Sequence, residues 1–123
     1  MRIVEKFGEI LKGKSKTQEP MDRYLNLVRK EPGNAKAHYN FGSVYLAQKV
    51  PDMAIAEYRE AIRAMPDYAL AHGMLAAVLL QTGKIDEAVT EYRRAVEIDP
   101  NNKDAQAALE KARAMQKAKS LKP

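Results

Sequence analysis

The chain has 123 residues, no cysteine and a formal net charge of +5. This length suits a single domain, and the lack of cysteine excludes a disulfide framework and a thiolate metal site. No apolar run reaches the roughly 18 residues that a membrane span needs, and the charged N-terminal sequence MRIVEKFGEI is unlike the core of a signal peptide. We therefore expect a cytoplasmic protein.

The positive charge lies at the two ends of the chain. Residues 1–34 carry eight Lys and Arg against five acidic residues, and residues 103–123 carry six against two. The middle of the chain, residues 35–102, carries seven against nine. Because the basic ends show no recognition-helix pattern and no interleaved aromatic residues, we interpret them as aids to solubility. Binding of nucleic acid or an anionic membrane is the weaker alternative.

Residues 1–34 predict two helices separated by a polar loop. The first helix spans residues 2–12, the loop residues 13–19, and the second helix, which opens on Pro20, residues 20–31. We interpret this segment as a degenerate copy of a unit that follows twice in the chain. The alternative is that residues 1–19 are a separate arm that docks elsewhere or swaps onto a neighbouring molecule.

The centre of the chain consists of two similar consecutive segments of 34 residues each. Residues 69–102 match residues 35–68 at 12 of 34 positions without a gap. A fixed period of this length is typical of stacked helical repeats. The shared residues are Ala35/Ala69, Ala37/Ala71, His38/His72, Val44/Val78, Leu46/Leu80, Asp52/Asp86, Ala54/Ala88, Glu57/Glu91, Tyr58/Tyr92, Arg59/Arg93, Ala61/Ala95 and Pro66/Pro100.

Each copy predicts two helices joined by a short turn, because apolar residues recur at i, i+3, i+4 and i+7. The predicted helices are 34–48, 51–64, 68–82 and 84–98. Pro51 suits the first position of a helix, and Gly83 suits a left-handed C-terminal cap. Asp67 and Asn102 are the expected N-caps of the helices that follow them.

Residues 103–118 predict one more helix, with an apolar stripe and otherwise polar or charged side chains. A repeat array needs such a helix at its end, because the outer seam of its last repeat would otherwise be bare. We interpret it as a capping helix, followed by a frayed tail at residues 119–123. The predicted fold class is therefore all-α, with about three helix-turn-helix repeats and a C-terminal capping helix.

The residues at the repeated positions resemble the tetratricopeptide repeat family. Residues 35–68 supply His38, Phe41, Gly42, Tyr45, Ala54, Tyr58, Ala61 and Pro66, and residues 69–102 supply His72, Leu75, Ala76, Leu79, Ala88, Tyr92, Ala95 and Pro100. Histidine, as His38 and His72, replaces the tryptophan that is usual at the fourth position of each repeat. The resemblance covers 68 residues and implies a right-handed α-solenoid whose concave side binds peptides.

No residue pattern points to catalysis or to a metal site. His38 and His72 would lie in neighbouring repeats about 10 Å apart, which is too far for two ligands of one zinc ion, so we interpret both as packing residues. Glu57 and Glu91 are expected on a solvated face beside arginines. Without a nucleophile–base pair or a phosphate loop, we predict no enzyme and no cofactor.

A second stripe on each first helix lies beside the packing seam, and exposed apolar patches of this kind usually mark interaction sites. By the resemblance, this stripe would line the concave groove. Gly73 and Ala77 would leave room there for a bulky side chain. The predicted groove residues are Lys36, Tyr39, Asn40, Ser43, Leu46, Leu70, Met74, Ala77, Leu80 and Gln81, with Asn40, Ser43 and Gln81 free to bond a peptide backbone.

The predicted function is a scaffold or adaptor that binds a peptide or amphipathic helix of another protein in this groove. The alternative is a self-associating structural module that forms a homo-oligomer through its repeat ends or a swapped N-terminal segment. One branch of the resembled family clamps acidic peptide tails with basic residues. Asn40 fits that clamp, but Glu5, Glu9, Leu70 and Met74 occupy its other positions, so a clamp is not expected.

Overall fold

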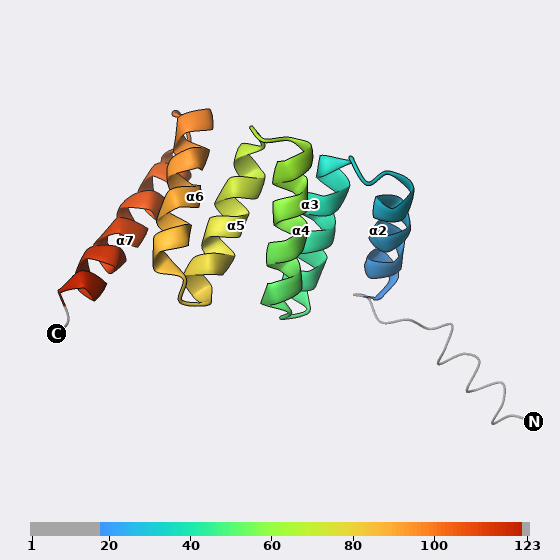
Figure 1. The fold of residues 1–123 in the computed structure, drawn as a ribbon, viewed down its shortest axis with the longest axis horizontal. Coiled ribbons are helices and arrows are strands. Elements are labelled where there is room, and N and C mark those ends of the chain that lie inside the picture. The colour runs from blue at the N-terminus through green and yellow to red at the C-terminus, as the bar shows by residue number, and fades with distance from the viewer. Residues whose placement is uncertain (1–17, 122–123) are drawn as a thin grey trace, which may run out of the picture.

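The computed structural model describes residues 18–121, which form six α-helices joined by short turns (Figure 1). The helices stand side by side in chain order, and each packs against the next, most extensively within the pairs α3–α4 and α5–α6. The described chain is therefore an open α-solenoid, and the prediction of an all-α repeat fold is confirmed. The helices are α2 (Gln18–Lys30), α3 (Ala35–Ala47), α4 (Pro51–Ala64), α5 (Ala69–Gln81), α6 (Ile85–Ile98) and α7 (Lys103–Ser120).

The helix boundaries differ from the predicted ones at the two ends of the described chain. Helix α2 includes Gln18, the first described residue, so residues 18–19 are helical and do not belong to the predicted loop. Helix α7 continues to Ser120, beyond its predicted end at residue 118. The predicted helix at residues 2–12 lies outside the described residues, as does most of the loop that follows it.

Three of the predicted turn and cap residues act as expected. Helix α4 begins at Pro51, where a missing amide hydrogen costs no helical hydrogen bond. Gly83 takes a positive φ of 85° after α5. Asn102 caps α7, since its side chain accepts a hydrogen bond of 3.0 Å from the Ala105 amide.

The prediction that Asp67 caps α5 is wrong, because the capping position is one residue later. Asn34 and Asn102 occupy that position before α3 and α7. Tyr68 stands there before α5 and makes no side-chain capping bond. Its ring instead packs on Tyr39, with 5.3 Å between the ring centroids. An aromatic contact between hairpins has replaced a cap at this position.

Lys49 should be a site of stored backbone strain. It has a φ of 63°, in the left-handed region that disfavours a side chain, and it occupies the position of Gly83 one period earlier. We expect Lys49→Gly to raise the free energy of unfolding by about 0.5–1 kcal/mol, measured by urea denaturation. Lys84→Gly is the control, because Lys84 has an ordinary φ of −90°. An equal gain in both variants would contradict the assignment of strain.

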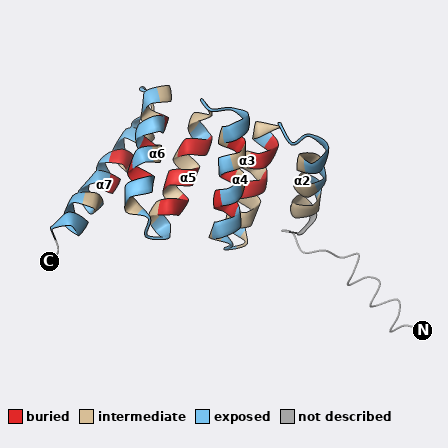
Figure 2. Ribbon diagram, viewed as in Figure 1, coloured by how far each residue is buried: buried red, intermediate tan, exposed pale blue. Residues whose placement is uncertain are grey.

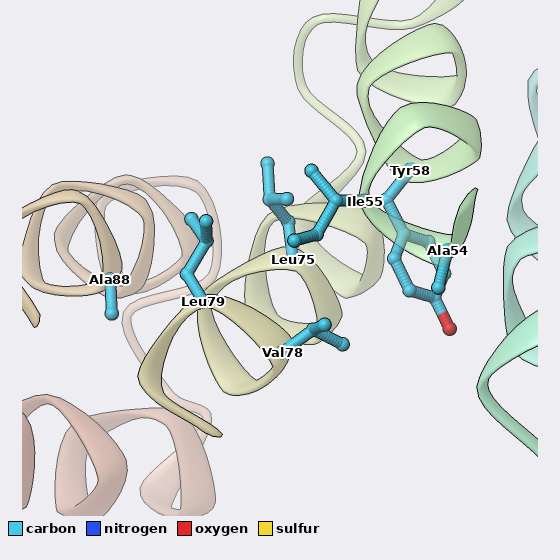
Figure 3. Packing of buried hydrophobic residues seen from close by; sticks show 7 residues of the cluster. All are labelled: Ala54, Ile55, Tyr58, Leu75, Val78, Leu79 and Ala88. Atoms are coloured by element: carbon cyan, nitrogen blue, oxygen red, sulfur yellow. The ribbon is translucent and has the colours of Figure 1, made fainter. Parts of the chain in front are cut away.

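The main core lies between the two central hairpins. Figure 2 shows that buried residues run through α3 to α6, and Figure 3 shows side chains of α4 and α5 meeting. Large and small side chains alternate there, so the helices approach closely without leaving gaps. The cluster consists of Ala54, Ile55, Tyr58, Leu75, Val78, Leu79 and Ala88. A second cluster joins α5, α6 and α7 through Ala76, Val89, Tyr92, Leu109 and Ala112.

Two helical glycines should respond to alanine in opposite directions. A Cβ at Gly42 would lie 2.9 Å from Cε1 of Tyr58, whose fully buried ring has no room to move. A Cβ at Gly73 would meet nothing within 4 Å. We expect Gly42→Ala to lower the unfolding free energy by about 1–2 kcal/mol despite the better helix propensity of alanine, and Gly73→Ala to raise it by about 0.5–1 kcal/mol. Thermal or urea unfolding of both variants measures this, and a shift of the same sign would contradict it.

Candidate functional site

The predicted groove residues all lie at the surface of α3 or α5, and none of them is buried. Lys36, Leu70 and Gln81 are exposed. Among the large apolar side chains of the predicted groove, that of Leu70 is the most exposed, at 58%. The other seven, which are half-buried, are Tyr39, Asn40, Ser43, Leu46, Met74, Ala77 and Leu80. We call the surface formed by α3, α5 and α7 the first-helix face, because α3 and α5 are the first helices of their hairpins.

A hollow of about 200 Å³ opens on the first-helix face. Three predicted groove residues line it, namely Tyr39, Leu70 and Met74. The other lining residues are Ala69 and Gly73 of α5, Tyr92 and Ala95 of α6, and Asn102, Asp104, Ala105 and Ala108 at or in α7. Asp104 is the one charged side chain in this lining, so the hollow offers a mostly apolar surface with a single negative charge.

The contribution of α6 and α7 to this hollow was not predicted from the sequence. Helix α7 was expected only to cap the array, yet Asp104, Ala105 and Ala108 form one wall of the hollow. Tyr92 was named only as a residue of the repeat pattern, and it also lines the hollow. The repeat register contains this information, because Ala105 and Ala108 follow Ala71 and Met74 by 34 residues.

The remaining predicted groove residues lie outside this hollow. Leu46 and Gln81 line a second hollow of about 360 Å³ together with Lys49 and Pro51. Ala77 and Leu80 pack against the buried clusters. Lys36 and Asn40 lie on the surface of α3 and line neither hollow.

Ser43 is already engaged within the chain, so the prediction that it is free for a peptide is wrong. Its hydroxyl donates a hydrogen bond of 3.1 Å to the carbonyl oxygen of Tyr39 and shares one of 2.9 Å with the hydroxyl of Tyr58. Burial raises the pKa of Tyr58 above its ordinary value, and the hydrogen bond to Ser43 opposes that rise. Ser43 therefore gives the hydroxyl of the buried Tyr58 a hydrogen-bond partner.

Tyr92 lacks the partner that Tyr58 has. Ala77 stands where the period would place a serine, and the described residues offer the Tyr92 hydroxyl no hydrogen bond. Burial raises the pKa of Tyr92, because the phenolate would be poorly solvated. The pKa of Tyr68 is raised for the same reason and, to a lesser extent, by Tyr39. A tyrosine with an unused hydroxyl thus lies in the wall of the hollow.

The two histidines form identical contacts in the two hairpins. Nδ1 of His38 lies 2.8 Å from Oε1 of Glu57, and Nδ1 of His72 lies 2.7 Å from Oε2 of Glu91. Each Nε2 donates a hydrogen bond of 2.8 Å to a proline carbonyl, that of Pro32 or Pro66. Both ring nitrogens of each histidine therefore face oxygen atoms of the same chain.

These contacts correct the prediction that Glu57 and Glu91 lie on a solvated face. The side chain of Glu57 is 16% exposed and that of Glu91 is 25% exposed. The signal in the sequence was the spacing, since each glutamate follows its histidine by 19 residues. The pairs leave no ring nitrogen free to bind a metal ion. The described residues contain no cluster of three or more potential metal ligands, and no described helix is long and apolar enough to cross a membrane.

Comparison with known proteins assigns the chain to a family. The tetratricopeptide repeat model matches residues 45–112, which is more than half of the chain. This chain belongs to the tetratricopeptide repeat family. Among the curated proteins, none matches the sequence.

Several solved tetratricopeptide domains share this fold. The first such domain of Spaghetti (RPAP3), bound to the HSP90 peptide SRMEEVD, is 25% identical over 91% of this chain and 87% of its own, with a TM-score of 0.78. The first domain of human RPAP3 is also 25% identical, over 94% and 90%, with a TM-score of 0.78. The Yersinia enterocolitica chaperone SycD, in complex with a YopD peptide, is 18% identical over 94% and 96%, with a TM-score of 0.75.

Proposed function

We propose that this tetratricopeptide repeat chain is a non-catalytic adaptor that binds a peptide or helix of another protein on its first-helix face. The observation that carries the proposal is the mostly apolar hollow on that face, with Leu70 exposed beside it. Exposed apolar surface in a hollow is what a partner side chain would cover. The related Spaghetti domain, whose structure holds a bound HSP90 peptide, supports peptide binding in general.

The partner should be apolar rather than acidic at its anchor points. Leu70 and Met74 stand on the face where an acidic tail would need cations, and Asp104 adds a negative charge. A carboxylate placed in this hollow would lose water without gaining a counter-ion, which is unfavourable. The peptide SRMEEVD of the Spaghetti complex is therefore not the expected kind of ligand here.

Two exposed side chains allow a matched experiment. Leu70→Lys changes the hollow and copies Lys36, which occupies the same position one period earlier. Met53→Glu changes another exposed apolar residue, on α4, and copies Glu87 one period later. We expect Leu70→Lys to weaken capture of partner proteins from a lysate of the source organism by at least tenfold, and Met53→Glu to leave capture unchanged.

Both variants should keep the unfolding temperature of the wild-type chain, because each introduces a residue that the repeat already tolerates at an exposed position. Capture of the same proteins in the same amounts by wild type and Leu70→Lys would contradict the proposed site. Equal losses in both variants would show that the first-helix face is not the surface responsible.

A further inference from the structure

The hollow on the first-helix face has a filled counterpart one period earlier in the same chain. There, the ring of Tyr39 projects from α3 and lies over Tyr58, with 5.6 Å between the ring centroids. The ring of Tyr68 also contacts Tyr39, with 5.3 Å between the ring centroids. Three aromatic rings from α3, α4 and the turn before α5 thus fill the space between the hairpins.

In the second hairpin the same framework is present without its central ring. Gly73 occupies the position of Tyr39, and Tyr92 occupies that of Tyr58. A Cβ built on Gly73 would meet no atom within 4 Å, so a side chain could begin at this position without a clash. Both Gly73 and Tyr92 line the hollow. The hollow is therefore the position of an aromatic side chain that this repeat does not supply.

We propose that this hollow receives an aromatic side chain from the partner peptide, with neutral or basic residues beside it. The proposal rests on the proposed adaptor function and specifies its ligand. An aromatic ring is preferred to an aliphatic chain because it can pack on the ring of Tyr92 as Tyr39 packs on Tyr58. A volume of about 200 Å³ suits one side chain rather than a cofactor.

The charge around the hollow indicates which residues should flank the aromatic residue of the ligand. Asp104, which lines the hollow, takes part in none of the ion pairs that the described residues form. A lysine or arginine next to the aromatic residue would be attracted to it, whereas a glutamate would be repelled. The unpartnered hydroxyl of Tyr92 adds one hydrogen-bonding group for a polar atom of the ligand.

The test uses the full chain and three synthetic heptapeptides followed by nuclear magnetic resonance titration. The first peptide has a central tyrosine with alanines and two lysines around it. The second replaces the tyrosine by leucine, and the third keeps the tyrosine and replaces both lysines by glutamate. We expect the tyrosine peptide to shift the amide signals of Gly73, Ala105 and Ala108 saturably, with a dissociation constant on the order of 1 mM or below. The leucine and glutamate peptides should each bind at least fivefold more weakly.

Two variants at one position control the titration. Gly73→Tyr supplies the missing ring from the chain itself, as Tyr39 does, and should abolish binding of the tyrosine peptide. Gly73→Ala leaves most of the hollow open and should retain it. Both variants should unfold at or above the temperature of the wild type, because glycine is the weaker helix former.

Four results would overturn the inference. Equal binding of the tyrosine and leucine peptides would remove the aromatic preference, and binding that survives Gly73→Tyr would move the site. The absence of a saturable shift, or a dissociation constant well above about 1 mM, would mean that no ring enters the hollow as proposed. Because the adaptor proposal depends on Leu70→Lys and lysate partners, it would survive each of these. A dimer of the wild type, lost in Gly73→Tyr, would name a second copy as the occupant and contradict a partner peptide.

Discussion

Replacing Tyr58 by alanine should lower the free energy of unfolding by about 4 kcal/mol, the largest loss expected of any single substitution in this chain. Tyr58 is the largest fully buried side chain. It packs against α3 at Gly42 and belongs to the cluster between α4 and α5. Its removal would leave a cavity at the junction of two hairpins, where the rigid backbones of three helices cannot collapse to fill it.

Urea unfolding of the alanine variant measures this loss, and phenylalanine variants separate packing from hydrogen bonding. Tyr58→Phe should cost about 1 kcal/mol, because it removes only the bond to Ser43. Tyr92→Phe should change stability by less than about 0.5 kcal/mol, since the described residues give its hydroxyl no partner. Equal costs for the two phenylalanine variants would contradict the difference drawn between the two tyrosines.

Replacing His72 by alanine should lower the free energy of unfolding by about 3 kcal/mol. His72 is only 6% exposed, and its ring joins Glu91 of α6 to the carbonyl of Pro66 before α5. Without the ring, the carbonyl and the half-buried carboxylate both lose their partners. The loss should stay below that of Tyr58→Ala because water can reach Glu91, whose side chain is 25% exposed.

A double-mutant cycle of His72→Ala and Glu91→Ala isolates the pair from the packing of the ring. We expect a coupling free energy of about 1–2 kcal/mol. The exposed pair of Arg94 and Glu97, at 3.4 Å, is the control and should show less than about 0.5 kcal/mol in the same cycle. Coupling energies of equal size would mean that the histidine–glutamate contact contributes no more than a surface ion pair.

The fold could be predicted because the repeat period fixes the register of every helix. Once residues 35–68 and 69–102 are aligned, Pro51 and Gly83 mark where the hairpins turn, and the structure places both as expected. The N-cap of α5 was still predicted wrongly, because Asp67 is a typical capping residue while the structure has Tyr68 at the capping position. The side chain of Tyr68 packs on the ring of Tyr39 instead, and a rule for local helix caps cannot predict such a contact between hairpins.

The candidate site could be predicted only in part, because its walls come from several helices. The stripe on α3 and α5 indicated Tyr39, Leu70 and Met74, which do line the hollow. The pairing of Ser43 with Tyr58 was missed, since hydrogen bonds between helices depend on how the hairpins pack and not on the periodicity of either helix. The wall from α7 was missed for the same reason.

The most direct test of the adaptor account is photo-crosslinking from position 70, where Leu70 projects beside the hollow and is 58% exposed. A benzophenone amino acid placed there in the full chain, and irradiated in cells of the source organism, should form covalent adducts with another protein. The same group at Ala56, an exposed residue of α4, should form none of these adducts, and Gly73→Tyr should remove them from position 70. Adducts from Ala56 alone, or equal adducts from both positions, would contradict a binding site on the first-helix face.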